Sequence, residues 1–447
     1  MNALSALFKQ GFAHGVHPAE NKERTQELPI QRMPFVDRYV IPLHQNLGAP
    51  AKAMVVPGQR VQRGECIAEP GAFVSTALHS PVTGWVRSIG PQRFVDGRFA
   101  QAIEITADPY STQRLAPKPP IDWAALSMDA FIGEIQQAGI VGLGGAAFPA
   151  HVKLSLPEGQ RIRHLLINGA ECEPFLTNDH RLMLERPETL IRGIEIMRQK
   201  LGAEEATIGV ELNKRDAIEV LQQHLRGDLP IRVVPLRVKY PQGAEKMLIK
   251  SIYNKEVPSG LLPRDLEILV NNVGTVVAIA DYFDLGMPLI ERVVTVSGPG
   301  VAYPANLIVP LGTPVREVLR FCGGLKEETR EVLMGGPMMG APIASLDAPM
   351  LKGSSGLLAF TAQETARPKE TPCIRCGRCV EACPYFLNPS RLARLAKARL
   401  FDEMKAYQVM ECVECGSCTF SCPSGIPIVQ LIRTAKDNLR QGKRRAD

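Results

Sequence analysis

The sequence predicts a multidomain α/β chain made of four units in series. Three observations predict this architecture: short β-type runs broken by Gly and Pro fill about the first 110 residues, strands alternate with helices from about residue 122, and eight of the 11 cysteines lie between Cys373 and Cys422. The 447 residues are 45% hydrophobic and 22% charged, which excludes a disordered or collagen-like protein. The net charge of +6 is small for this length and can be carried by a solvated surface without a nucleic-acid or membrane partner.

Residues 1–120 are predicted to form a β barrel-sandwich hybrid. The segments VVPGQRVQRGECI and HSPVTGWVRSI place glycines and a proline at turns and resemble the two halves of a biotinyl/lipoyl-type domain. No lysine stands at the hairpin tip between the two halves. We therefore expect a structural or docking role for this unit and no carried lipoyl or biotinyl group.

Residues 121–290 show the alternation of an α/β domain. A helical pattern of Phe131, Ile132 and Ile135 leads into a glycine loop, and an apolar strand at 164–171 is followed by one amphipathic helix at 182–201. Residues 291–360 contain two short strands, a turn and a helix that resemble a β-grasp (SLBB-like) unit. Residues 361–447 begin with a linker at 361–372 and carry predicted helices at 389–410 and 428–439, as in an α-helical ferredoxin domain.

The cysteines of the last unit form two runs of identical spacing, C-x-x-C-x-x-C-x-x-x-C-P. This spacing is typical of proteins with two [4Fe–4S] clusters, in which the fourth cysteine of each run binds the other cluster. Structural zinc is the alternative, but zinc sites are usually built from two pairs of ligands. The predicted ligand sets are Cys373, Cys376, Cys379 and Cys422 for one cluster, and Cys412, Cys415, Cys418 and Cys383 for the other.

The loop from Gly142 to Ala147 satisfies a G-x-G-x-x-A pattern but not its structural context. A dinucleotide-binding loop follows a strand and opens a helix, whereas this loop follows a helical pattern and meets Pro149. Its backbone amides are unshielded by side chains, and Lys153 is near in sequence. These features favour a phosphate site.

Four segments in order, GLGGAAFPAHVK, INGAECEPF, YPQGAEK and VNNVGT, resemble the flavin- and NADH-site segments of the complex I 51-kDa flavoprotein family. With the leading barrel-sandwich unit and the tandem cysteine runs, residues 12–440 are similar to the C-subunit family of Rnf complexes. The resemblance implies bound, non-covalent FMN, two [4Fe–4S] clusters, and NADH as substrate. Two positions depart from the complex I pattern: Ala147 replaces a loop glycine, and Ala170 replaces an aspartate beside the flavin.

The resemblance also implies roles for individual residues. The FMN phosphate and ribityl chain would lie against the glycine loop and Lys153, Phe148 would stack on NADH, and Glu173 would meet the NADH ribose. The implied cofactor-binding residues are Gly142, Gly144, Gly145, Phe148, Lys153, Asn168, Glu171, Glu173, Gly243, Glu245, Asn271, Asn272 and Thr275. No protein side chain is predicted to be catalytic, because the flavin carries the chemistry.

The function implied is that of the NADH-oxidising input subunit of an ion-translocating NADH:ferredoxin oxidoreductase. Its partners would be the other subunits of the membrane complex, with ferredoxin or flavodoxin as the eventual partner. Two alternatives use the same parts: a corrinoid (cobalamin) reductase, against which the leading barrel unit argues, and a flavin-free docking or electron-relay subunit.

The sequence also predicts where the protein works. The start, MNALSALFKQGFAHGVHP, lacks a basic segment followed by an apolar core, and no run approaches the ~18 apolar residues that cross a bilayer. We expect a peripheral protein on the cytoplasmic side of the inner membrane, with no direct membrane span. The apolar positions Leu4, Leu7, Phe8 and Phe12 favour a docking helix at the N-terminus.

Overall fold

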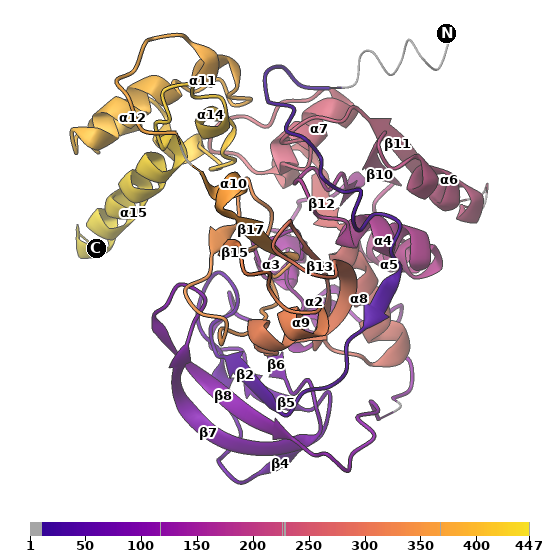
Figure 1. Ribbon diagram of the computed structural model, residues 1–447. Helices are drawn as coiled ribbons and strands as arrows, with labels where there is room; N and C mark the ends of the chain where they lie inside the picture. Colours follow the sequence, from indigo (N-terminus) through magenta and orange to yellow (C-terminus); the bar gives the residue numbers. More distant parts are fainter. Residues whose placement is uncertain (1–10, 117, 226, 228, 367, 447) are drawn as a thin grey trace.

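The computed structural model describes residues 11–446 apart from 117, 226, 228 and 367. Within these residues the strands form four sheets. Figure 1 shows the β unit at one end, the α/β unit and a mixed sheet in the middle, and a helical unit at the other end. No helix among the described residues has the length and apolar character needed to cross a membrane. Leu4, Leu7 and Phe8 lie outside the described residues, and Phe12 is buried.

The N-terminal unit consists of two facing sheets, as predicted for a barrel-sandwich hybrid. Their orders are β2-β8-β7-β4 and β3-β5-β6, and Tyr39, Ile67 and Ile103 are fully buried between them. The loop at 70–76, where a carrier domain would hold its lysine, lies on the next unit: Gln136 Nε2 donates to the carbonyls of Ala72, Phe73 and Ser75. The strands are β2 (Arg38–Pro42), β3 (Lys52–Ala53), β4 (Arg60–Val61), β5 (Cys66–Glu69), β6 (Leu78–His79), β7 (Gly84–Arg93) and β8 (Phe99–Ala107).

The α/β unit contains a parallel sheet of order β11-β10-β9-β12 between helices. Its apolar strands bury residues on both faces, as parallel sheets do. The strands are β9 (His164–Gly169), β10 (Glu205–Glu211), β11 (Ile231–Leu236) and β12 (Ile268–Asn272). The helices are α2 (Met128–Gln137), α3 (Ala150–Leu154), α4 (Asn178–Glu185), α5 (Pro187–Leu201), α6 (Arg215–His224), α7 (Glu245–Tyr253), η1 (Pro263–Leu266) and α8 (Val273–Leu285).

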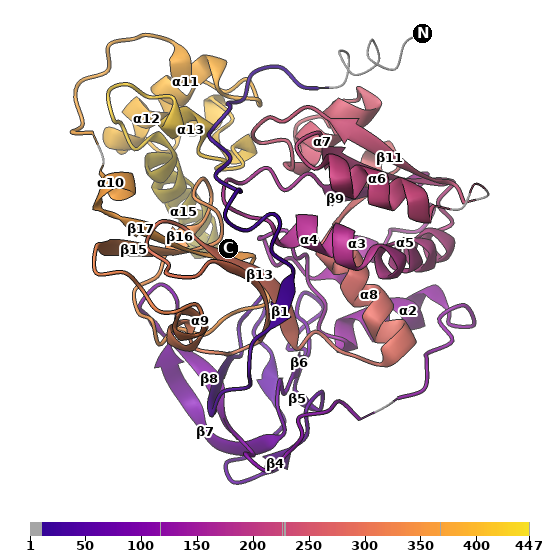
Figure 2. The ribbon, with the colours of Figure 1, turned by 45° about the vertical axis from the view of Figure 1, so that its right-hand side comes forward.

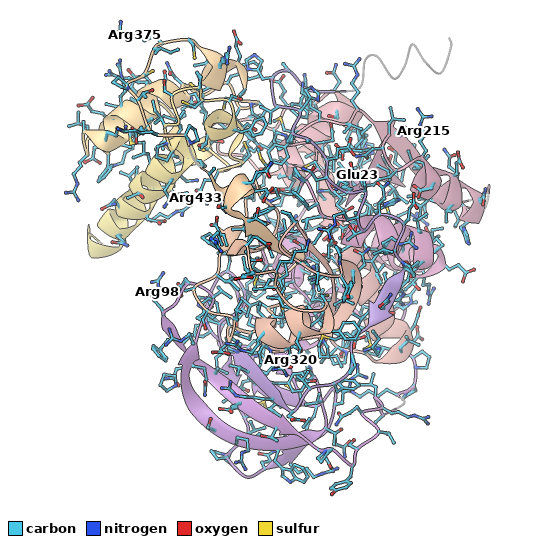
Figure 3. The ribbon with its side chains drawn as sticks, viewed as in Figure 1. Glu23, Arg98, Arg215, Arg320, Arg375 and Arg433 are labelled. Atoms are coloured by element: carbon cyan, nitrogen blue, oxygen red, sulfur yellow. The ribbon has the colours of Figure 1, made fainter. Side chains whose placement is uncertain are left out.

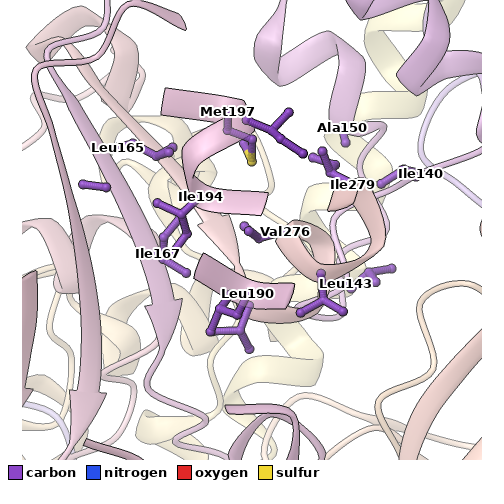
Figure 4. Packing of buried hydrophobic residues seen from close by; sticks show 14 of the residues in the cluster. Ile140, Leu143, Ala150, Leu165, Ile167, Leu190, Ile194, Met197, Val276 and Ile279 are labelled. Atoms are coloured by element: carbon purple, nitrogen blue, oxygen red, sulfur yellow. The ribbon is translucent and has the colours of Figure 1, made fainter. Parts of the chain in front are cut away.

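The core of this unit lies where α5 and α8 cross the sheet (Figure 4). Leu190 and Ile194 of α5 pack against Val276 of α8 and Ile167 of β9, and all four are fully buried. Gly193 permits the close approach of the two helices, because a Cβ at this position would lie 2.3 Å from the Val276 carbonyl oxygen.

The single helix predicted at 182–201 is wrong, since the structure has two helices there. Arg186 leaves the helical conformation with φ −134° and ψ 42°, directly before Pro187. Proline disfavours a helical conformation in the residue that precedes it and is well accommodated as the first residue of a new helix. The break separates α4, which reaches the candidate site, from α5, which fills the core.

The mixed sheet has the order β1-β14-β13-β17-β15-β16 and is the predicted β-grasp unit. Its edge strand, β1 (Ile30–Arg32), comes from the N-terminus and pairs in parallel with β14. Residues 11–32 therefore run along the outside of the α/β unit before the chain enters the barrel sandwich, as Figure 2 shows. We call this segment the strap. The other elements are β13 (Glu291–Ser297), β14 (Ala305–Pro310), α9 (Val315–Phe321), β15 (Thr329–Met334), β16 (Ala341–Pro342) and β17 (Gly356–Thr361).

In the helical unit the two cysteine runs have the same backbone course. Arg375 and Glu414 have φ of 59° and 60°, and Gly377 and Gly416 have φ of 80° and 82°. Each glycine starts a short helix that carries the third cysteine of its run, α11 or α14. The helix predicted at 389–410 is interrupted after Lys397, because Arg399 adopts φ 58°. The helices are α10 (Ala362–Thr365), α11 (Arg378–Glu381), α12 (Pro389–Lys397), α13 (Glu403–Ala406), η2 (Val409–Glu411), α14 (Ser417–Phe420) and α15 (Ile428–Ala446).

Candidate functional site

The glycine loop lies at the carboxyl end of strand β12, where parallel sheets bind ligands. The Leu143 amide donates to Thr275 Oγ1 at 2.9 Å, and a Cβ on Gly144 would lie 3.6 Å from the Asn272 side chain. Gly144 and Gly145 are exposed, so their backbone is open to a ligand. The structure thus brings together the first and last of the four sequence segments.

Ala147 takes a left-handed conformation in this loop, with φ 49°. A non-glycine residue in that region costs roughly 1 kcal/mol, so the departure from glycine retains the loop shape at a modest cost. Ala170 donates its amide to Asn168 Oδ1 at 3.2 Å. Asn168 also donates from Nδ2 to the Gly243 carbonyl at 2.8 Å, which joins the second and third segments.

Lys153 supplies the positive charge of the site. Its Nζ donates to Glu245 Oε1 at 2.7 Å and to the Val270 carbonyl at 2.8 Å, and the side chain remains 29% exposed. Glu245 begins α7, so its carboxylate also complements the helix N-terminus. The ammonium is held in place by protein contacts and is accessible to an anion.

Two buried amide side chains near the loop have atoms without a partner among the described residues. Asn271 Nδ2 and Asn178 Oδ1 are both buried and lack a hydrogen-bond partner. Buried polar atoms of this kind are rare unless a ligand or water satisfies them. Asn271 is the next-to-last residue of β12, beside the capping residue Asn272, so the unpartnered donor lies at the ligand-binding edge of the sheet.

Exposed backbone amides, a fixed ammonium and an unpartnered amide suit a phosphate-bearing ligand with a polar chain. This combination fits FMN, whose phosphate needs donors and whose ribityl hydroxyls accept and donate hydrogen bonds. The sequence prediction of a phosphate site at the loop is thus consistent with the donor set that the structure brings together.

The acidic loop after β9 is engaged with the protein itself. Glu171 caps α4, since its carboxylate accepts from the amides of Asp179 at 2.6 Å and His180 at 3.2 Å. Glu173 accepts from the amides of Met338 at 3.0 Å and Met339 at 2.9 Å. The structure thus brings the Glu173 carboxylate against the β-grasp unit.

Sequence reasoning missed Lys22 and Asp179, which support the site. Lys22 Nζ is buried and donates to the carbonyls of Glu171 at 2.9 Å and Glu173 at 3.0 Å, and also to that of Leu176. Burial lowers the pKa of Lys22. Asp179 Oδ2 accepts from Asn272 Nδ2 at 2.6 Å, and burial together with the Glu171 charge raises the pKa of Asp179 to about 7.

Burial raises the pKa of Glu173 from about 4.5 to about 7. Between these pH values the folded state binds more protons than the unfolded state, because the charged carboxylate is costly to bury. The free energy of unfolding therefore falls as pH rises through the window, by roughly 3 kcal/mol in total. Hydrogen-exchange protection of the Met338 and Met339 amides is expected to fall about 100-fold from pH 4.5 to 7. Glu173→Gln, which does not titrate, should flatten this dependence, and an unchanged slope in that variant would contradict the assignment.

The eight cysteines of the two runs line two separate cavities. We call the first the outer cysteine cavity; it is lined by Cys373, Cys376, Cys379 and Cys422. We call the second the inner cysteine cavity; it is lined by Cys383, Cys412, Cys415 and Cys418. Each cavity therefore combines three cysteines of one run with the last cysteine of the other, the pattern expected of two [4Fe–4S] clusters.

The inner cysteine cavity faces the flavin-site segments. Tyr240 Oη donates to the Cys415 carbonyl at 2.7 Å, and the Tyr240 ring is buried in a cluster with Cys172 and Met338. The Cys172 Sγ in turn accepts from the Gly243 amide at 3.2 Å. Tyr240 thus links the second and third site segments to a loop that carries a predicted cluster ligand.

The exchange of the fourth ligand can be tested by Cys422→Ala. This variant is expected to lower bound iron from about eight to about four, by removing the cluster of the outer cavity although Cys422 belongs to the second run. Its remaining electron paramagnetic resonance spectrum should equal that of Cys373→Ala and differ from that of Cys412→Ala. Cys322→Ala, at a buried cysteine outside both cavities, should keep about eight irons. A Cys422→Ala spectrum equal to that of Cys412→Ala would show that each run binds its own cluster.

Four family models match the chain. They are the RnfC barrel sandwich hybrid domain at residues 10–110, the Nuo51 FMN-binding domain at 135–281, the SLBB domain at 293–342 and the 4Fe-4S dicluster domain at 372–427. The dicluster match decides between iron–sulfur and zinc in favour of iron–sulfur. An FMN-binding domain joined to a dicluster domain defines an iron–sulfur flavoprotein of electron transport.

Similar proteins narrow this class. The chain is 43% identical over 396 residues to the C subunit of the proton-translocating ferredoxin:NAD(+) oxidoreductase complex of Clostridium ljungdahlii, covering 89% of this chain and 86% of that protein. It is 38% identical over 400 residues to the Na(+)-translocating counterpart of Acetobacterium woodii, covering 90% of each. The C subunit of the ion-translocating oxidoreductase complex of Pseudomonas aeruginosa is 42% identical over 412 residues, which are 91% of this chain and 53% of that protein. The chain belongs to the RnfC family, the C subunits of ion-translocating ferredoxin:NAD(+) oxidoreductase complexes.

Among solved structures, the fold is similar to a chain of an NAD+-reducing [NiFe]-hydrogenase in the air-oxidized state. The TM-score is 0.51 at 18% identity, and the match covers 73% of this chain and 70% of that chain. At this identity the likeness concerns the fold alone.

Proposed function

We propose that this chain is the electron-input subunit of an ion-translocating ferredoxin:NAD(+) oxidoreductase, oxidising NADH at non-covalent FMN and delivering electrons to two [4Fe–4S] clusters. When bound, FMN accepts electrons as a hydride and releases them singly. The observation that carries the proposal is the hydrogen bond from Tyr240 Oη to the Cys415 carbonyl, because it places the loop of a cluster ligand directly against the flavin-site segments.

For the individual residues we propose binding roles that the family resemblance implies and the donor set of the loop supports. The exposed amides of the glycine loop and the Lys153 ammonium would bind the FMN phosphate, and Asn271 Nδ2 would find its partner on the ribityl chain. Phe148 would offer its half-buried ring to the nicotinamide or adenine of NADH. Asn168 and Glu171 would lie at the ring edge, with the remaining contacts from Gly142, Gly144, Gly145, Gly243, Glu245, Asn272 and Thr275.

For Glu173 we propose a positioning role in place of the ribose contact. Its two carboxylate oxygens hold the amides of Met338 and Met339, and Met338 packs against Gly416 of the second cysteine run. A Cβ on Gly416 would lie 2.7 Å from the Met338 carbonyl oxygen. Glu173 would therefore fix the distance between the flavin-site loop and the inner cysteine cavity.

The proposed surroundings are those of a peripheral subunit. We propose that the chain lies on the cytoplasmic side of the inner membrane, bound to the other subunits of the complex, with ferredoxin or flavodoxin as the eventual partner and no nucleic-acid partner. For the four-part division at residues 1–120, 121–290, 291–360 and 361–447, we propose that the strap be counted with the α/β and β-grasp units it crosses.

One spectrum tests the proposed function. The anaerobically purified protein is expected to show flavin absorbance that NADH bleaches, together with about eight irons and eight sulfides. Iron and sulfide without flavin would instead favour the flavin-free relay, and a flavin that NADH fails to reduce would exclude NADH as the donor.

A further inference from the structure

The rim of the outer cysteine cavity carries much of the positive charge of the chain. Residues 369–399 hold seven Lys and Arg and two Asp and Glu, a net charge of +5, against +6 for the whole chain. Arg375, Arg391, Arg394 and Lys397 line the cavity itself, together with one carboxylate, that of Glu370, which pairs with Lys397. Basic residues gathered at one place in an otherwise nearly neutral chain create a local field that attracts an acidic surface.

The outer and inner cysteine cavities differ in exposure. Cys373 and Cys376 of the outer cavity are exposed, whereas Cys412 and Cys415 of the inner cavity are half-buried and Cys418 is buried. Figure 3 shows Arg375 at the outer end of the helical unit, pointing away from the α/β unit. The outer cavity is thus the one that another protein can reach.

Contacts from the rest of the chain hold the side of the inner cavity. His14 Nδ1 lies 3.1 Å from the Cys383 carbonyl oxygen, and Tyr240 Oη donates to the Cys415 carbonyl. Glu411, next to Cys412, accepts from Ser259 Oγ at 2.8 Å and from Lys246 Nζ at 3.3 Å. These contacts fix the helical unit with its inner cavity toward the flavin site and its outer cavity toward solvent.

An exposed apolar side chain lies within the basic rim. Ile374 is 69% exposed between Cys373 and Arg375. An apolar anchor surrounded by charges is the usual composition of a specific protein interface, in which the charges steer the encounter and the apolar group is buried.

We propose that the basic rim of the outer cysteine cavity is the docking surface for an acidic face of a one-electron carrier protein of the same complex. The inference rests on the proposed function and adds where electrons leave this chain and which kind of surface binds the carrier there. A cluster held by the four cysteines of the outer cavity would give one electron to the carrier in each transfer, so two transfers would balance the oxidation of one NADH.

Charge reversal at the rim tests the docking surface. The full-length double variant Arg375→Glu and Arg394→Glu is compared with a matched double variant on other units, Arg98→Glu and Arg320→Glu, whose side chains are 86% and 71% exposed. Binding is measured by sedimentation with host membranes that lack this subunit. The rim variant is expected to bind at least about tenfold more weakly, and wild-type binding should weaken with added salt, since rim charges act through screened attraction.

Three readouts make the result decisive. Iron content should be unchanged in the rim variant; if Arg375→Glu lowers the iron content, Arg394→Glu alone is used. Equal binding by the rim and control variants would overturn the docking surface. Binding to protein-free vesicles of phosphatidylglycerol and phosphatidylethanolamine that matches binding to membranes would also overturn it, in favour of a lipid contact.

Reduction of menadione, an uncharged acceptor, by NADH tests the proposed function separately, because it needs the flavin site and not the rim.

Discussion

Lys153→Glu is expected to yield a protein that lacks FMN but still carries about eight irons. In the structure the ammonium is held between Glu245 Oε1 and the Val270 carbonyl, beside the exposed glycine loop. The substitution would remove the charge-assisted hydrogen bond proposed between Lys153 and the phosphate, worth about 1.5–3 kcal/mol, and it adds a second carboxylate next to Glu245. FMN affinity should therefore fall about 100-fold or more, as measured by flavin fluorescence after desalting.

The matched control is Lys250→Glu on the same domain. Lys250 pairs with Glu256 at 2.9 Å in a partly exposed ion pair on α7, so the control makes the same charge reversal away from the loop. It is expected to retain FMN. Lys153→Met, which removes the charge without adding a carboxylate, should lie between the two. Full FMN occupancy in Lys153→Glu would show that the phosphate binds elsewhere.

Those parts of the candidate site whose chemistry depends on the spacing of residues close together in the chain could be predicted from the sequence. The identical spacing of the two cysteine runs predicted two mixed sets of ligands, and the structure gathers the same two sets around two cavities. The glycine loop could be separated from a dinucleotide-binding loop because Pro149 follows it closely, and α3, which begins at the next residue, is only five residues long. Order and spacing along the chain carried both inferences.

Features that depend on distant pairing could not be predicted in the same way. The strap reads as a polar segment, yet Lys22 is buried against a loop about 150 residues away, and β1 pairs with β14. Glu173 resembles a ligand-binding residue by its motif, but its partners are backbone amides of Met338 and Met339, and backbone amides leave no signature in a sequence. The contacts of Lys22 and Glu173 could therefore not be found from sequence, because their partners are main-chain groups of remote segments.

This distinction suggests how the site is kept rigid. The residues proposed to bind the cofactor come from loops at the end of the parallel sheet, while the groups that hold those loops come from the strap and the β-grasp unit. Binding groups are positioned well only when surrounding contacts fix them. Disturbing the strap should therefore affect the flavin site without any change in a residue that touches flavin.

Lys22→Met is expected to release the acidic loop and to loosen the strap. Lys22 Nζ donates to three carbonyls, those of Glu171, Glu173 and Leu176, and methionine leaves all three buried without that donor. Leaving three buried carbonyls without their charged donor costs about 3–4 kcal/mol, at roughly 1 kcal/mol or slightly more for each carbonyl. The backbone hydrogen bond from the Phe175 amide to the Glu20 carbonyl, 2.8 Å long, joins the loop to the strap and reports on this opening. Hydrogen-exchange protection of the Phe175 amide should fall by a factor of about 100 to 1,000.

Glu23→Met provides the control, because it places the same side chain one residue further along the strap, where Glu23 is exposed (Figure 3). Protection of the Phe175 amide should remain close to wild type in this variant, since surface substitutions usually change stability by less than about 0.5 kcal/mol. Lys22→Met should also weaken FMN binding. Without Lys22 the backbone of Glu171 is no longer held, and the Glu171 carboxylate caps α4. Asp179 of α4 in turn accepts a hydrogen bond of 2.6 Å from Asn272, which is one of the proposed binding residues. Unchanged exchange at Phe175 in Lys22→Met would show that the strap is held by its other contacts, the hydrogen bonds of Thr25 and the pairing of β1 with β14.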